Sequence, residues 1–89
     1  MTCEELTNLI KNNMPEKAIV AADEIIGRGG APAWAYLLRS EALLATGRLG
    51  RALSDLHMAM NVEPNAETEQ RIKALQSVID FRNTDMLNP

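Results

Sequence analysis

The chain has 89 residues, a formal net charge of −3 and an isoelectric point near 5.0, and 46% of its residues are hydrophobic. These values fit one domain that buries a core, and they exclude the strongly basic surface that nucleic-acid binding usually requires. The single cysteine, Cys3, excludes an internal disulfide, and no apolar run approaches the roughly 20 residues of a membrane span. Because the N-terminus also lacks a basic region followed by an apolar stretch, we expect a cytoplasmic protein that contacts neither membranes nor nucleic acids.

The first part of the chain predicts two helices joined by a short turn. Thr2 and Glu5 have the spacing of a capping box, which predicts a helix over 3–12. Pro15 suits the first turn of a second helix over 15–27, because the amide hydrogen that proline lacks has no partner there. A glycine-rich stretch follows and favours a helix end.

Three further helices are predicted over 32–46, 49–62 and 66–82. Gly47 ends the first of them and Pro64 ends the second, since glycine tolerates the left-handed conformation and proline cannot continue a helix. The apolar residues of the last helix cover more than one of its faces. We therefore expect neighbours on two sides of that helix.

The C-terminal segment 83–89 shows no helical pattern and is predicted to form a tail. Because Met86 and Leu87 are apolar, we expect them to pack onto a surface of this chain or of a second copy. No segment has the alternating pattern of a strand, so the expected fold class is all-α. The expected organisation is one domain over 1–82, made of two repeat-like units, 1–30 and 31–64, and a capping helix, 66–82.

The two hairpins are similar to each other after one constant shift along the sequence, which we call the repeat period. The matched pairs share chemical class or structural role: Leu9 with Leu43, Asn13 with Gly47, Ala18 with Ala52, Ile19 with Leu53, Ala22 with Leu56, Ile25 with Ala59 and Gly30 with Pro64. This shift equals the period of the tetratricopeptide repeat, which is about 34 residues. The segment from Ala33 to Ala66 resembles one complete repeat of this family, whose signature positions here hold Tyr36, Ser40, Leu43, Gly47, Leu49, Ala52, Leu56, Ala59 and Pro64.

The resemblance implies a stack of two antiparallel helix hairpins closed by a capping helix, as in an α–α superhelix. Ser40 and Ala52 would be small so that the two helices of one hairpin approach closely. The flanking units follow the family pattern less well: Asn13 replaces the turn glycine of the first repeat, and Phe81 stands where the turn glycine of a third repeat belongs.

The resemblance also implies a groove, because the first helix of each hairpin lines a concave surface in this family. That surface would hold Trp34, Leu37, Leu38, Glu41, Leu44, Leu75, Val78 and Ile79, with Cys3 and Thr7 from the first hairpin. Exposed apolar patches mark interaction sites, and tryptophan is a typical anchor. The expected function is therefore non-catalytic binding of a peptide, a helix or a partner protein. The alternative is a structural homo-oligomer, such as a homodimer, whose groove is used for self-association.

Few residues could carry chemistry. His57 is the only histidine, and a catalytic dyad would pair it with Cys3 or a carboxylate. Its helix also carries core residues such as Leu53 and Leu56, so a helix-surface position is the favoured interpretation. One histidine and one cysteine are too few for a metal site. We expect no catalytic residues, no metal and no cofactor.

Overall fold

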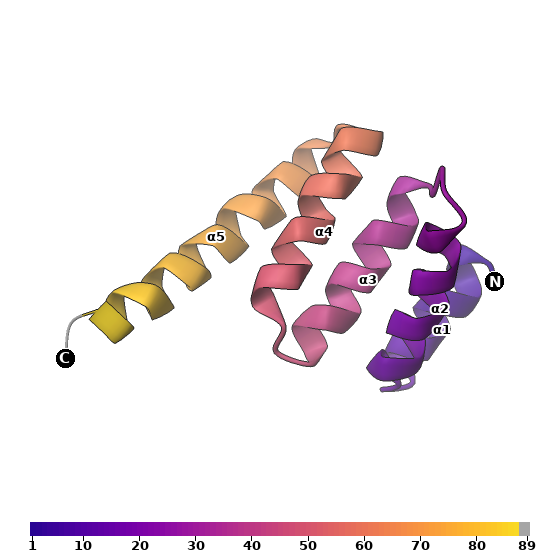
Figure 1. The fold of residues 1–89 in the computed structure, drawn as a ribbon, viewed down its shortest axis with the longest axis horizontal. Helices are drawn as coiled ribbons and strands as arrows, with labels where there is room; N and C mark the ends of the chain where they lie inside the picture. Colours follow the sequence, from indigo (N-terminus) through magenta and orange to yellow (C-terminus); the bar gives the residue numbers. More distant parts are fainter. Residues whose placement is uncertain (88–89) are drawn as a thin grey trace.

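The computed structural model describes the backbone of residues 1–87 and the side chains of residues 1–82, and it confirms the all-α fold class. Within these residues there is no strand, and the helices are α1 (Cys3–Lys11), α2 (Pro15–Gly27), α3 (Ala33–Ala45), α4 (Leu49–Val62) and α5 (Ala66–Leu87). Short connections reverse the chain between neighbouring helices, and α5 leans away from the other four (Figure 1). The first four predicted helices are confirmed to within one residue at each end.

The predicted tail is wrong for residues 83–87. These residues continue α5, which ends at Leu87 and not near residue 82. The sequence holds no glycine or proline between Ala66 and Pro89, so nothing in it forces the helix to stop earlier. The side chains of Met86 and Leu87 lie outside the described residues, and their packing stays a prediction.

Side-chain caps fix the starts of α1 and α5. The Thr2 hydroxyl accepts from the Glu5 amide at 3.2 Å, and the Glu5 carboxylate accepts from the Thr2 amide at 3.1 Å, which confirms the capping box. This bond from the Thr2 amide also lowers the pKa of Glu5. At α5, the Asn65 side-chain oxygen accepts from the amides of Glu67 and Thr68 at 2.8 and 3.2 Å. These bonds satisfy amides that have no partner within the helix.

The two hairpin turns share one backbone geometry and lie one repeat period apart. Asn13 has a φ of 60° and Gly47 a φ of 77°, so both adopt the left-handed conformation. In each turn the next amide donates at 2.9 Å to a leucine carbonyl of the preceding helix, Met14 to Leu9 and Arg48 to Leu43. This is the Schellman pattern of a helix end. The two turns therefore share both their backbone conformation and this hydrogen bond.

A third turn of this kind does not form. Phe81 lies one repeat period after Gly47 and stays within α5. Positive φ is unfavourable for a bulky residue, whereas asparagine and glycine tolerate it. α5 continues past position 81, whereas α1 and α3 each end before the turn residue.

Small residues let the helices approach one another. The side chains of Ala18, Ala22, Ala42 and Ala52 have no exposed area, and Ser40 is almost as deeply buried. Small side chains at a helix contact shorten the distance between the axes. Larger buried side chains, Leu6, Leu43 and Leu56, fill the space around these contacts.

Arg39 of α3 joins three helices. Its Nε and Nη2 atoms donate to the two carboxylate oxygens of Asp55 in α4, at 2.7 and 2.6 Å, and Nη1 donates to Asp23 in α2 at 2.9 Å. The bonds to Asp55 raise the pKa of Arg39 above its already high ordinary value, so the guanidinium stays charged. It also lies 6.0 Å from the centre of the Tyr36 ring. This network, which we call the Arg39 clamp, fixes the second hairpin to α2.

The turn geometry predicts opposite effects for two glycine substitutions. A Cβ atom at Gly47 or at Gly50 would meet no atom within 4 Å, so only backbone conformation distinguishes them. Gly47→Ala must hold alanine at positive φ and should destabilise the fold by about 1 kcal/mol. Gly50→Ala, in the first turn of α4, should stabilise it by about 0.5 kcal/mol. Urea unfolding of both variants measures the difference, and equal effects would contradict the left-handed turn.

The Arg39 clamp predicts that removal of its two carboxylates, one at a time, destabilises the fold to unequal extents. Asp55→Ala removes a partner that is 3% exposed and leaves Arg39 partly buried without it, which should destabilise the fold by about 3 kcal/mol. Asp23→Ala removes a half-exposed partner and should destabilise it by less than about 1 kcal/mol. Thermal unfolding separates the two, since about 4–8 °C corresponds to 1 kcal/mol in a domain of this size. Equal melting temperatures would show that the clamp is not a buried interaction.

Candidate functional site: an apolar cavity between α3 and α5

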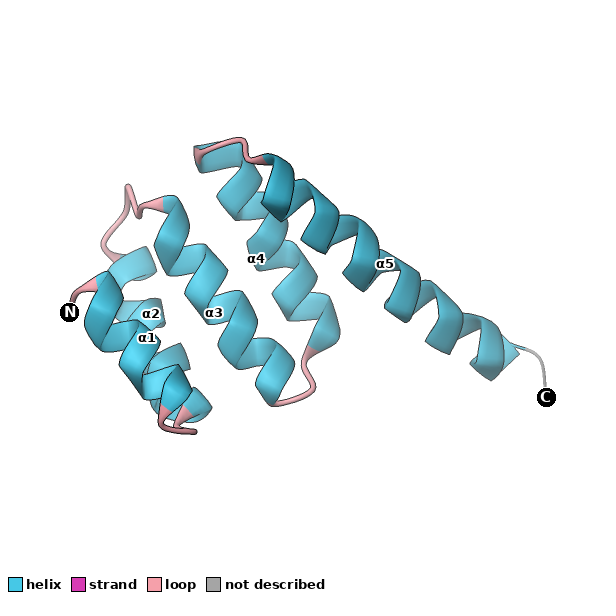
Figure 2. Ribbon diagram, turned by 180° about the vertical axis from the view of Figure 1, so that it is seen from behind, coloured by secondary structure: helices cyan, strands magenta, loops and turns pink. Residues whose placement is uncertain are grey.

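The departure of α5 from the stack leaves a cavity beside α3. α1 packs closely against both α2 and α3, whereas α5 packs closely against α4 and, among the described residues, meets α3 through side chains such as Arg71 and Glu41. Figure 2 shows α5 diverging from α3 and α4 towards its C-terminal end. The cavity has a volume of about 380 Å³, and its lining comes from three helices: Ser40, Glu41 and Leu44 of α3, Leu56 of α4, and Arg71, Ala74, Leu75 and Val78 of α5. We call it the α3/α5 cavity.

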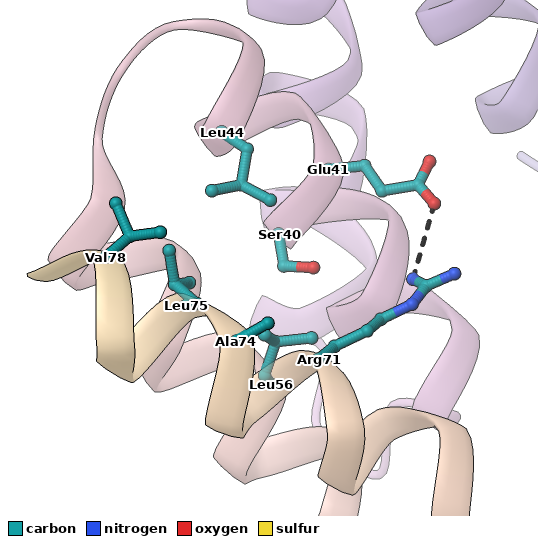
Figure 3. A pocket seen from close by; sticks show the side chains of 8 residues that line it. All are labelled: Ser40, Glu41, Leu44, Leu56, Arg71, Ala74, Leu75 and Val78. Carbon is teal, nitrogen blue, oxygen red and sulfur yellow. Dashed lines mark ion pairs between the residues drawn. The ribbon is translucent and has the colours of Figure 1, made fainter.

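Apolar side chains form the base and most of the wall. Leu56 and Leu75 belong to the buried core, and their side chains close the base of the cavity. Leu44 and Val78 lie at one end and remain 40% and 48% exposed (Figure 3). The Ser40 hydroxyl donates to the Leu37 carbonyl at 2.6 Å and is therefore already satisfied. The interior thus favours an apolar occupant, because a polar one would lose its hydration without gaining a partner.

An ion pair marks the opposite end of the cavity. Arg71 lies 3.5 Å from Glu41 across the space between α5 and α3, and 3.2 Å from Glu67 one turn earlier in its own helix. Both side chains of the crossing pair are 42% exposed, so the pair contributes little to stability. The pair nevertheless gives both charged residues of the lining, Glu41 and Arg71, a partner of opposite sign.

The structure brings half of the predicted groove residues into this cavity. Glu41, Leu44, Leu75 and Val78 line it. The other four, Trp34, Leu37, Leu38 and Ile79, lie outside it and pack, half-buried, against the core. Trp34 is half-buried, and its role as an anchor stays a prediction. Cys3 is exposed and Thr7 half-buried on α1, and neither lines the cavity.

Four lining residues were not among the predicted groove positions: Ser40, Leu56, Arg71 and Ala74. The sequence assigned Ser40 and Leu56 to packing inside the hairpin, and they do pack there, but the tilt of α5 leaves them facing the cavity. Arg71 and Ala74 precede Val78 by seven and four residues, so they share its helix face. That spacing was a signal that could have identified them.

The polar side chains of the lining are those of Ser40, Glu41 and Arg71. Of the described residues that line it, only Glu41 and Arg71 ionise, and they pair with each other. His57 lies exposed on α4 and is not part of the lining. Among the described residues, no three histidine, cysteine or acidic side chains gather as a metal site would need, and no helix is both long and apolar enough to cross a membrane.

Comparison with known proteins assigns no family. No protein-family model matches the chain, and neither curated proteins nor solved structures show significant similarity to it.

Proposed function

We propose that this chain is a non-catalytic protein-interaction module that binds apolar side chains of another polypeptide in the α3/α5 cavity. The observation that carries the proposal is the lining of that cavity. Leu44, Ala74 and Val78 present apolar surface to solvent, while the polar groups around them are already paired. Open apolar surface of this kind is typical of protein-binding sites.

The proposal includes a tetratricopeptide-type architecture. Its support is the turn that recurs after one repeat period, with Asn13 and Gly47 at positive φ, and the small residues Ser40 and Ala52 at the contact of α3 with α4. In this family, grooves between neighbouring first helices receive peptides or helices, and α3 and α5 are two such helices. A cytoplasmic location belongs to the same proposal and rests on the free, exposed thiol of Cys3.

A second candidate function is that of a structural subunit that associates with itself. The observation that favours it is Phe81, which is 68% exposed on α5, one helical turn beyond the cavity residue Val78. A large exposed aromatic side chain is a common anchor of protein interfaces.

Substitution of Val78 tests the proposed function. Val78→Glu places a charge at the apolar end of the cavity, and glutamate is a good helix former, so α5 should stay intact. Val20→Glu is the matched control, since Val20 is 59% exposed on α2, away from the cavity. The wild type and each variant are immobilised and incubated with a native lysate. Partners that the wild type and Val20→Glu retain should not bind to Val78→Glu. Retention by all three chains would show that the cavity is not the binding site.

The apolar lining also predicts that binding depends little on salt. Exposed ion pairs are screened by salt, whereas apolar contacts are not. Affinity for a retained partner should therefore change by much less than about tenfold between low and physiological salt. Titration calorimetry at the two salt concentrations measures this. A tenfold loss would indicate that charges such as Glu41 and Arg71 dominate recognition.

A further inference from the structure

The interface between α1 and α3 shows how equivalent helices of this chain pack when they are in close contact. α3 follows α1 by one repeat period, and α5 follows α3 by one more. α1 packs closely against α3, whereas within the described residues α5 packs closely against α4 alone. The α1/α3 interface is therefore an internal reference for the α3/α5 cavity, and a comparison of equivalent residues can show why the cavity is open.

Most lining positions of the cavity keep the character of the positions one repeat period earlier. Apolar or small residues stand at both members of five pairs: Ile10 with Leu44, Leu44 with Val78, Leu6 with Ser40, Ala22 with Leu56, and Ser40 with Ala74. Large and small side chains exchange places in the third and fourth pairs, so the total side-chain volume changes little. Side-chain volume therefore does not explain why the space beside α3 is open.

Two lining positions change from an uncharged to a charged residue. Glu41 stands one repeat period after Thr7, and Arg71 stands one repeat period after Leu37. Thr7 and Leu37 are half-buried, and the Thr7 hydroxyl donates to a carbonyl of its own helix at 2.8 Å. The last lining residue, Leu75, changes in the opposite sense, since its equivalent is Glu41. The added charges of Glu41 and Arg71 thus distinguish the cavity from the close interface.

These two charges meet across the opening between α3 and α5. Figure 3 shows the side chains of Glu41 and Arg71 reaching towards each other from the two helices. Nη1 of Arg71 lies 3.5 Å from Oε1 of Glu41, and each side chain is 42% exposed. Nη2 of Arg71 also donates to Glu67 at 3.2 Å. The pair joins the helices while both of its charges remain in contact with water.

Closure of α5 onto α3 would remove water from this pair. The free energy that an ion pair loses when it leaves water can exceed the free energy returned by the attraction between its charges. The apolar gain would be small, because Leu44 and Val78 are already more than half buried. The open position of α5 is therefore favoured as long as both charges are present.

We propose that the pair of Glu41 and Arg71 keeps α5 apart from α3 and so keeps the α3/α5 cavity open. The two are positioning residues, which act through the separation of the helices and not through contact with a partner. The consequence for binding rests on the proposed function, because an open cavity admits an apolar side chain and a closed one excludes it.

Three double variants test the role of the charges. Glu41→Thr with Arg71→Leu, the closed variant, carries the residues found one repeat period earlier. Glu41→Gln with Arg71→Met, the neutral variant, removes the charges at nearly unchanged length, and both replacements are good helix formers. Glu41→Arg with Arg71→Glu, the swapped variant, is the matched control, because it retains an ion pair between α3 and α5. Both positions are exposed enough that the buried core stays unchanged, which circular dichroism verifies.

The distance between α3 and α5 is the direct measurement. Spin labels on cysteines at Ala45 and Arg82, which are exposed on α3 and α5, report it in a Cys3→Ser background. Helices in close contact have axes about 8–10 Å apart. We expect the label distance to shorten by several ångströms in the closed and neutral variants and to match that of the wild type in the swapped variant. A change in helix stability alone would not alter this distance.

An unchanged distance in the closed and neutral variants would overturn the inference, and so would an equal shortening in the swapped variant. The outcome for the proposed function is separate. If the distance shortens and the closed variant also loses the partners that the swapped variant retains, both proposals are supported. If the distance shortens while every variant retains those partners, the ion pair sets the helix separation but the cavity is not the binding site.

Discussion

The ability of one residue in each repeat to adopt a left-handed backbone decides how the chain is arranged. Asn13 and Gly47 both have positive φ, and each lets its helix stop and the chain reverse within a short turn. Phe81 stands at the third such position and remains helical. Because a bulky side chain disfavours positive φ, α5 keeps its direction where α1 and α3 end. The described chain forms two closed hairpins and one helix, α5, that continues without a turn.

The way α5 packs accounts for the cavity. Ile10 and Leu44 are equivalent after a shift of one repeat period, yet Ile10 is half-buried and Leu44 is 40% exposed. α1 lies against α3, whereas α5 leaves the corresponding space beside α3 open. For this reason Leu56 lines the cavity although it is deeply buried. An apolar face is present here because the helix expected to cover it packs at another angle.

The helices were predictable because their signals are local. The capping box of Thr2 and Glu5, the turn at Gly47 and Pro15 at a helix start each depend on a few neighbouring residues. The continuation of α5 past residue 82 was missed because polar residues there obscure the periodicity while no residue breaks the helix. The site was only half predictable, because its composition depends on the angle between α5 and α3. No short sequence pattern encodes that angle, so Trp34 was included and Arg71 was missed.

The Arg39 clamp reaches α2, α3 and α4 but not α5. The attachment of α5 consists of apolar contacts such as that of Leu75 with the core, together with the exposed pair of Arg71 and Glu41. A helix at the end of a helical array, with fewer contacts than the helices inside it, opens locally at a lower free energy. We therefore expect the amide hydrogens of α5 to exchange with solvent through openings that leave the hairpins intact. The angle at which α5 packs thus sets the width of the cavity that it shares with α3.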